Sequence, residues 1–219
     1  AEEVEKLLSL TQTWFNRDGD DVANNLSALT KGDHYLWNPQ NKAPYFYQVF
    51  FERPIIQEIL MHFLNDEWYR EIPSDEPNYI MRNLVGRSRV KKLPMHIDSF
   101  IPYQGDHVYS MQVAIILEDQ NTENGCTVLV PGSHLAGQYA DQASFETATP
   151  IESKAGDVVL WDSRIWHGTL ENNSDGTRWA LIASFGRWWL KQMFNLPQSL
   201  PREFFDQLTN SQRAVLGFC

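Results

Sequence analysis

Three side chains with metal-binding chemistry stand out in this chain of 219 residues. His96 and Asp98 are separated by a single residue in the segment 93–100. On a β-strand, alternate side chains leave the same face, so both groups would point the same way. A third ligand must come from elsewhere, and His167 is the best candidate. Two neutral imidazoles and one carboxylate on one side of a metal are typical of non-haem Fe(II) sites, whose remaining positions stay open to substrates.

A guanidinium is expected at the end of the metal pocket. Arg178 follows His167 and directly precedes the apolar run 179–185. If that run is a strand that returns past the metal, Arg178 lies at the end of the pocket, where its planar fork can hold a carboxylate through two parallel hydrogen bonds. Considered alone, such a residue would by default be a strand-end arginine in a surface salt bridge, but here several features coincide in order along the chain.

The composition indicates one packed domain, 1–219. Hydrophobic residues make up 42% of the chain and aromatic residues 13%, which is typical of a globular protein with a full-sized core. The formal charge of −10 argues against a nucleic acid partner, because binding to phosphates requires a basic surface. No apolar run reaches membrane-spanning length, the charged start does not resemble a signal peptide, and two cysteines do not form a disulfide framework. We therefore expect a cytoplasmic protein with reduced thiols and no membrane partner.

Hydrophobic periodicity predicts helices at both ends and strands between them. Helical spacing marks 2–15, 20–29, 54–64 and the tail 200–216, whereas 35–39 and 43–51 are rich in aromatic residues and look irregular. Strand-like runs separated by turns cover 79–85, 90–97, 108–117, 126–130, 158–161 and 179–188. Short strands without intervening helices favour a mainly β jelly roll. The predicted layout is a helical layer at about 1–75, a jelly-roll core at about 78–190 and a helical tail at about 200–219.

The chain carries several motifs whose type and order along the sequence resemble those of the phytanoyl-CoA dioxygenase family. This family of Fe(II)- and 2-oxoglutarate-dependent oxygenases includes ectoine hydroxylase. The likeness runs from about residue 78 to the C-terminus. The motifs are His96-Ile-Asp98, the Asn124-Gly125 turn leading into Val130-Pro-Gly-Ser-His134, the segment Asp162-Ser-Arg-Ile-Trp-His-Gly-Thr169, and Arg178.

This resemblance implies a double-stranded β-helix (jelly roll, cupin-like) with Fe(II) on His96, Asp98 and His167. It further implies that Arg178, assisted by the Thr169 hydroxyl, holds the distal carboxylate of 2-oxoglutarate. By position, Asn83 is similar to an asparagine that helps hold 2-oxoglutarate in ectoine hydroxylase. The implied reaction consumes O2 and 2-oxoglutarate, releases succinate and CO2, and hydroxylates an unactivated C–H bond. Halogenases of this architecture lack the carboxylate ligand, so Asp98 favours hydroxylation.

Two residues of the run 108–117 face the same side by strand alternation. Gln112 is either a cosubstrate contact or a buried amide satisfied within the sheet. Relatives often carry tryptophan at the position of Ala114, so the pocket is either opened on that side or filled by Trp161, Trp166 or Trp188. The other histidines considered, His62, His107 and His134, are interpreted as surface or structural residues.

Two other functions remain open, and the substrate is not identified. Two histidines and a carboxylate also bind zinc, as in a hydrolase or isomerase, and a jelly roll can be a non-catalytic binding module. The many aromatic residues suit a partly apolar small-molecule substrate. The basic residues Arg87, Arg89, Lys91 and Lys92 form either a contact for an acidic group or a solvated strand edge.

Overall fold

The computed structural model describes residues 2–18, 33–70, 72–73 and 75–218. The helices are α1 (Glu2–Asp18), α2 (Tyr45–Phe51), α3 (Pro54–Leu64), α4 (Leu196–Ser199), α5 (Arg202–Phe205) and α6 (Asn210–Val215), with short 3-10 turns η2 (Pro39–Asn41), η3 (Ser133–Leu135) and η4 (Gln142–Thr147). The strands are β1 (His34–Trp37), β2 (Tyr79–Ser88), β3 (Leu93–His96), β4 (Ser110–Ile116), β5 (Thr127–Leu129), β6 (Thr149–Ile151), β7 (Val158–Asp162), β8 (His167–Thr169) and β9 (Ala180–Arg187).

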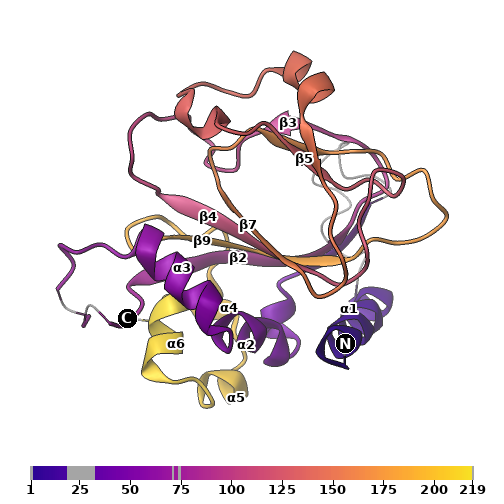
Figure 1. Ribbon diagram of the computed structural model, residues 1–219. Helices are drawn as coiled ribbons and strands as arrows, with labels where there is room; N and C mark the ends of the chain where they lie inside the picture. The colour runs from indigo at the N-terminus through magenta and orange to yellow at the C-terminus, as the bar shows by residue number, and fades with distance from the viewer. Residues whose placement is uncertain (1, 19–32, 71, 74, 219) are drawn as a thin grey trace.

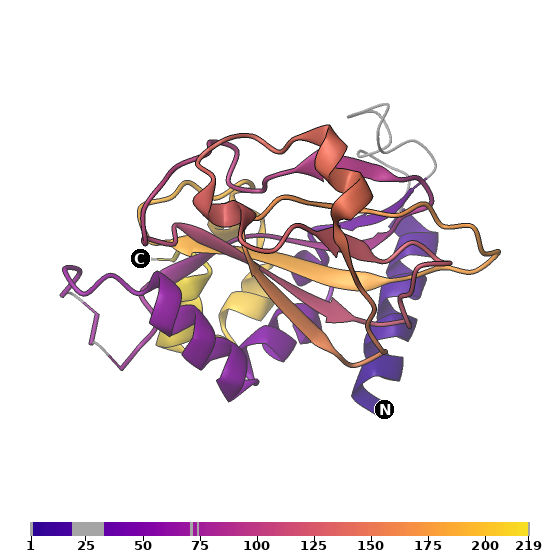
Figure 2. The same ribbon diagram turned by 45° about the horizontal axis from the view of Figure 1, so that its top comes forward.

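The strands form two antiparallel sheets. The larger has the order β1-β2-β9-β4-β7 and the smaller the order β3-β8-β5-β6. In Figure 1 the larger sheet lies below and the smaller sheet above it, and all the helices lie on the far side of the larger sheet. Figure 2 shows the turns η3 and η4 on the side of the smaller sheet, away from the helices. The predicted jelly-roll fold with helices from both ends of the chain is confirmed.

Strand alternation gives the larger sheet two different faces. Toward the helices β4 and β9 present Val113, Ile115, Leu181, Ala183 and Phe185, which belong to the main hydrophobic core. Burying such a side chain contributes about 1.5–3 kcal/mol, and this burial holds the helices against the sheet. The opposite face carries a smaller cluster: Ala114, Ile116 and Ala180, packed with Val159, Trp161 and Ile182. This second face lines the space between the two sheets.

Helix boundaries follow local rules where the sequence carries them. The predicted helices 2–15 and 54–64 are confirmed as α1 and α3, and Pro54 occupies the first turn of α3, where a missing N–H is tolerated. The predicted tail helix is present in two short pieces, α5 and α6, and a capping box of Thr209 and Gln212 begins the second. The helix predicted at 20–29 lies outside the described residues.

Some elements differ from the prediction. The aromatic-rich segments are regular rather than irregular, because β1 pairs with β2 and α2 buries five of its residues in the core: Phe46, Tyr47, Val49, Phe50 and Phe51. Strands β6 and β8 were not predicted. Each has only three residues, which is too short to show alternation, and tertiary pairing alone defines them.

A glycine sets how closely β3 and β8 approach. Gly168 is the middle residue of β8, and a Cβ atom placed there would come within 2.5 Å of the Leu93 carbonyl oxygen in β3. Real Cβ atoms do not make such a contact, so any larger residue would push the two strands apart. This pair of strands carries His96 and His167 directly opposite each other.

The first prediction concerns this close approach. Gly168→Ala should destabilise the protein by about 1–3 kcal/mol, which lowers the melting temperature by about 2–4 °C per kcal/mol. It should also weaken metal binding, because the two histidines separate. The matched control is Gly176→Ala, where the nearest atom would lie at 3.7 Å. Equal melting temperatures for the two variants would contradict the packing described.

Candidate metal centre

The two sheets bring three potential metal ligands together. His96 ends β3, Asp98 follows two residues later, and His167 begins β8 opposite His96. Asp98 Oδ1 lies 3.5 Å from His96 Nε2, and Asp98 Oδ2 lies 3.2 Å from His167 Nε2. One ligand atom from each residue lies within 4.8 Å of the others. This is the only group of three such residues found among the described parts of the chain, and it matches the predicted triad.

Backbone carbonyl groups orient both imidazoles. His96 Nδ1 lies 3.0 Å from the Pro94 carbonyl oxygen, and His167 Nδ1 lies 3.0 Å from that of Ile165. A carbonyl can only accept, so Nδ1 carries a proton in each ring and Nε2 is the atom that faces Asp98. The two rings lie 4.1 Å apart between centroids. The arrangement therefore directs two imidazole nitrogens at one point, where a metal could take the place of the protons between them and Asp98.

Asp98 is held on the same point and is ionised. Its backbone N–H donates to the Ser163 carbonyl oxygen at 2.8 Å, which ties the end of β3 to the segment before β8. Burial alone would raise the pKa of the Asp98 carboxyl group, but the charge and hydrogen bonds of His167, and then of His96, outweigh it and hold the pKa well below its usual range. A cation between the rings would act in the same direction.

Arg178 lies at the end of the space between the sheets. By alternation along β9 it shares a face with Ala180 of the inter-sheet cluster. It is buried, its Nε donates to the Arg89 carbonyl oxygen at 3.2 Å, and its Nη2 has no partner. Burial first, and then Arg87 and Arg89, lower the pKa of Arg178 to about 10, so the group stays charged at neutral pH. A buried cation with an unused donor is the chemistry that an anion satisfies.

Thr169 offers a second unused polar atom at this end. Its Oγ1 is buried without a hydrogen-bond partner, and by alternation it leaves the same face of β8 as His167. Thr169 pairs with Thr127 in β5, and the preceding residue, Cys126, lies close enough to Arg178 to perturb its pKa. The orphaned hydroxyl and guanidinium nitrogen therefore lie in the same region of the molecule.

The two amides proposed as cosubstrate contacts have partners within the sheet. Gln112 Nε2 donates to the hydroxyl groups of Ser163 and Ser184 at 3.1 and 3.2 Å. Asn83 Oδ1 accepts from the Ser184 N–H at 3.2 Å. The contacts of Gln112 Nε2 agree with the structural interpretation of this residue as a buried amide held within the sheet. Neither Gln112 Oε1 nor the amide nitrogen of Asn83 has a hydrogen-bond partner in these contacts.

The region of Ala114 is filled by one of the three candidate tryptophans. Trp161 packs against the cluster that contains Ala114 and makes an edge contact with His167 at 5.5 Å. Trp166 instead donates to the Gln138 carbonyl oxygen, and Trp188 stacks on Tyr69. Trp161 therefore forms one wall of the metal centre.

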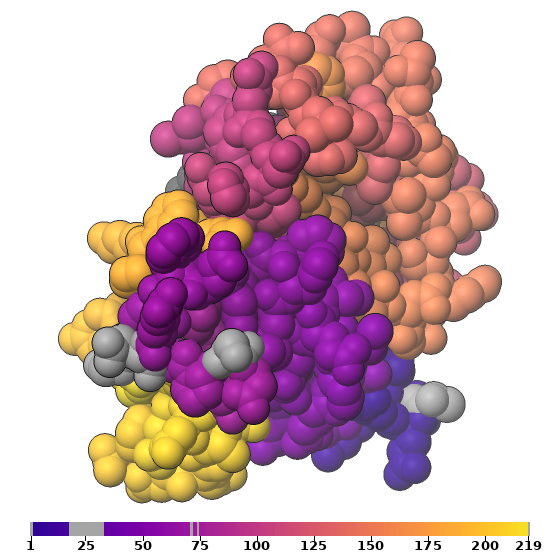
Figure 3. All heavy atoms as spheres, turned by 60° about the vertical axis from the view of Figure 1, so that its left-hand side comes forward, coloured from indigo at the N-terminus to yellow at the C-terminus, as the bar shows by residue number. Residues whose placement is uncertain are grey.

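A groove opens beside this wall. It has a volume of about 450 Å³ and is lined by residues of α3, β7, η3 and the loop 97–109, with Trp161 among them. In Figure 3 the purple surface of α3 lies below the pink surface of that loop. Trp161 borders both the groove and His167, whereas none of the three metal ligands lines the groove.

The basic residues before His96 are mainly structural. Arg89 is buried in an ion pair with Asp33 at 3.0 Å and also donates to the Tyr35 hydroxyl at 3.1 Å. Lys92 lies over the Phe145 ring at 3.5 Å. A different arginine, Arg82, lies close enough to the metal ligand Asp98 for the carboxylate to affect its pKa. A β-bulge in β2 leaves Arg82 between two paired positions. A bulge has no signal in the sequence pattern, so this residue was not predicted.

None of the helices in the described parts of the chain is long and apolar enough to cross a membrane.

Comparison with known proteins agrees with this geometry. The chain is 27% identical to Dioxygenase af480 of Aspergillus fumigatus over 138 residues, covering 61% of this chain and 45% of that protein. It is 28% identical to Dioxygenase himG of Aspergillus japonicus over 169 residues, covering 66% of this chain and 50% of that protein. The chain thus spans about half the length of these curated relatives.

Solved structures share the fold at low sequence identity. HygX from Streptomyces hygroscopicus, solved with nickel and 2-oxoglutarate, superposes with a TM-score of 0.66 at 16% identity, covering 88% of this chain and 80% of that one. The epimerase SnoN, solved with Fe3+, α-ketoglutarate and nogalamycin RO, gives a TM-score of 0.66 at 17% identity, covering 85% and 75%. The family model described as phytanoyl-CoA dioxygenase (PhyH) matches residues 1–180. This chain therefore belongs to the phytanoyl-CoA dioxygenase family.

Proposed function

We propose that this protein is an Fe(II)- and 2-oxoglutarate-dependent oxygenase that hydroxylates an unactivated C–H bond of a small molecule. One observation carries the proposal: His96, Asp98 and His167 converge at one point, and the buried Arg178 keeps an unpaired Nη2 at the end of the same inter-sheet space. The three ligands lie on one side of that point and suit Fe(II). The guanidinium and Thr169 suit a carboxylate.

Each residue has a defined part in this mechanism. His96, Asp98 and His167 would hold the metal, and the carbonyl groups of Pro94 and Ile165 keep both rings in the ligating tautomer. Arg178 and Thr169 would orient the distal carboxylate of 2-oxoglutarate, so that its 2-oxo acid end reaches the metal. When bound, iron supplies the oxidative chemistry that converts 2-oxoglutarate and O2 into succinate, CO2 and an oxidant for the substrate. Trp161 would form the wall of this region beside His167.

The ligand set favours hydroxylation over halogenation. Asp98 fills the position that a halogenating centre would need to leave free for chloride. Neighbouring structures include an epimerase and a carbocyclase, so the position of the substrate, rather than the ligand set, decides between hydroxylation and those outcomes. Zinc hydrolysis on the same ligands would leave the buried Arg178 and Thr169 without a role.

The decisive activity measurement is succinate formation from 2-oxoglutarate with Fe(II), O2 and ascorbate. If the protein is an oxygenase, succinate forms in the presence of iron and does not form when zinc replaces the iron. Succinate formation alone does not identify the substrate. A metabolite mixture is therefore incubated with the protein, and its components are searched for a mass gain of one oxygen atom. A zinc-dependent hydrolytic product without succinate would instead support the hydrolase alternative.

The second prediction tests the ligand assignment. His167→Ala should lower the affinity for Mn(II), a redox-stable substitute for Fe(II), by at least about tenfold, as measured by calorimetric titration, and should abolish succinate formation. His62→Ala is the matched control, because His62 lies on the exposed side of α3. Unchanged Mn(II) affinity in the His167 variant would show that the metal binds elsewhere.

The third prediction tests the cosubstrate assignment. Arg178→Lys keeps a positive charge but loses the planar fork, so the affinity for 2-oxoglutarate should fall by about ten- to a hundredfold, while Mn(II) binding should hardly change. Anaerobic titration of 2-oxoglutarate against the metal-loaded protein measures this. Arg202→Lys is the control, since Arg202 is an exposed residue of α5 that contacts Asp206 and the Phe205 ring. Should the Arg178 variant bind 2-oxoglutarate like the parent protein, the assignment would have to be abandoned.

A further inference from the structure

Arg82 projects into the space between the sheets at the end opposite Arg178. The register of β2 against β9 shifts between Met81 and Asn83, which leaves Arg82 in the bulge. Its side chain lies across Gly186, where a Cβ atom would come within 2.7 Å of Arg82 Cδ. Gly186 leaves the same face of β9 as Ala180 of the inter-sheet cluster. Met81 belongs to the main core on the helix-covered face, so Arg82 leaves the opposite, inter-sheet face.

The guanidinium of Arg82 is buried but has unused donors. Its Nε donates to the Lys191 carbonyl oxygen at 3.3 Å, and its terminal nitrogens make no hydrogen bond or ion pair among the described residues. Burial lowers the pKa of Arg82, and the charge of Asp98 acts in the opposite direction. The metal ligand Asp98 is thus close enough to influence Arg82 electrostatically. A partly desolvated cation with two free amino groups is suited to an anionic ligand.

Phe100 covers this guanidinium in a strained conformation. Its backbone φ is +64°, which is unusual for a bulky residue, and its ring is 58% exposed. The Cζ atom of Arg82 lies 5.9 Å from the centre of the ring. A large aromatic side chain held in strain and in solvent, two residues after a metal ligand, contributes little to the core and is typical of a functional site.

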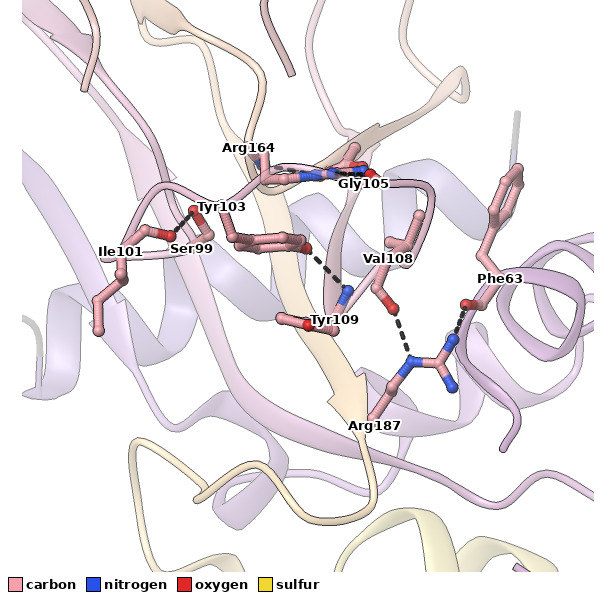
Figure 4. Close-up of polar contacts among 10 residues, drawn as sticks. Phe63, Ser99, Ile101, Tyr103, Gly105, Val108, Tyr109, Arg164 and Arg187 are labelled. Atoms are coloured by element: carbon pink, nitrogen blue, oxygen red, sulfur yellow. Dashed lines mark hydrogen bonds and ion pairs between the residues drawn. The ribbon is translucent and has the colours of Figure 1, made fainter. Parts of the chain in front are cut away.

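Two arginines fix the loop that carries Phe100. Figure 4 shows Arg164 donating to the Gly105 carbonyl oxygen at 2.7 Å and Arg187 donating to that of Val108 at 2.8 Å. Within the loop the Tyr109 N–H donates to the Tyr103 hydroxyl at 2.9 Å. On the other side of Phe100, the Asp98 and Ser99 N–H groups donate to the Ser163 carbonyl oxygen. The backbone of the loop is therefore anchored before and after Phe100.

We propose that Arg82 anchors an acidic group of the primary substrate, a carboxylate or a phosphate, while Phe100 covers the apolar part of the molecule next to it. This assignment rests on the proposed function and names its substrate class. About 20 Å of strand separates Arg178 from Ser184, the residue paired beside the bulge. The two guanidinium groups therefore serve different anions: Arg178 the cosubstrate, and Arg82 the substrate, on the Asp98 side of the metal.

The test uses the full chain loaded with Mn(II) and saturated with 2-oxoglutarate, with phenylacetate and phenyl phosphate as anionic probes and phenylacetamide as the neutral one. Paramagnetic relaxation of the ring protons by Mn(II) reports binding near the metal. We expect at least one anionic probe to bind and the neutral amide to bind at least about tenfold more weakly. Arg82→Gln should weaken the anionic probe by a similar factor, Arg82→Lys should restore part of the affinity, and Arg202→Gln should change nothing.

Several results would overturn the proposal that Arg82 binds an acidic group of the substrate. One is failure of both anionic probes to bind the wild-type protein, and another is equal binding of the acid and the amide. A third is an Arg82→Gln variant with a lower melting temperature but unchanged probe affinity, which would show a purely structural role. If the wild-type protein does not bind 2-oxoglutarate, the proposed function itself fails. Intact 2-oxoglutarate binding with probe binding insensitive to Arg82 would reject the anchor alone.

Phe100→Gly provides an independent arm of this test. Glycine removes the ring and also relieves the positive φ, so the variant should melt at the same or a higher temperature than the parent while binding the anionic probe severalfold more weakly. Loss of stability with unchanged probe binding would show that Phe100 is a packing residue and would contradict its assignment to the substrate.

Discussion

The antiparallel pairing of β3 with β8 is the interaction on which the rest of this structure depends. It places His96 opposite His167, and only glycine at 168 allows the two backbones to approach so closely. The turn after β3 then bonds to Ser163 and brings Asp98 back toward both rings. Because each strand is very short, the remainder of the jelly roll must hold this pair in register. The main core between the larger sheet and the helices therefore stabilises the site indirectly.

Charge is distributed along the inter-sheet space in a way that suits ordered binding of anions. A carboxylate and two imidazoles occupy the middle, and buried guanidinium groups with unused donors occupy the two ends, Arg178 and Arg82. Electrostatic interactions in such a partly dry space are stronger than in water, and unpaired buried charges are costly. Bound anions would offset that cost. If the proposed function holds, the arrangement favours ligands that carry acidic groups at a distance from the reacting carbon.

The sequence predicted the chemistry better than it predicted the local structure. His96, Asp98 and His167 could be selected because ligand types and one-residue spacing are visible in the chain, and the structure brings these residues together. Arg82 could not be selected, because a β-bulge depends on pairing with β9 and leaves no periodic signal. The aromatic segment 43–51 looked irregular, yet burial of five residues against the sheet makes it the helix α2. Strand β8 was missed for a similar reason, since its three residues are defined only by their partners.

The most direct measurement is a crystal structure of the protein grown anaerobically with Fe(II) and 2-oxoglutarate. Our account expects an anomalous iron peak bonded to His96 Nε2, His167 Nε2 and the Asp98 carboxylate. It also expects the distal carboxylate of 2-oxoglutarate within hydrogen-bonding distance of Arg178 Nη2 and Thr169 Oγ1. Iron bound at any other residues, or a cosubstrate carboxylate that does not contact Arg178, would contradict it.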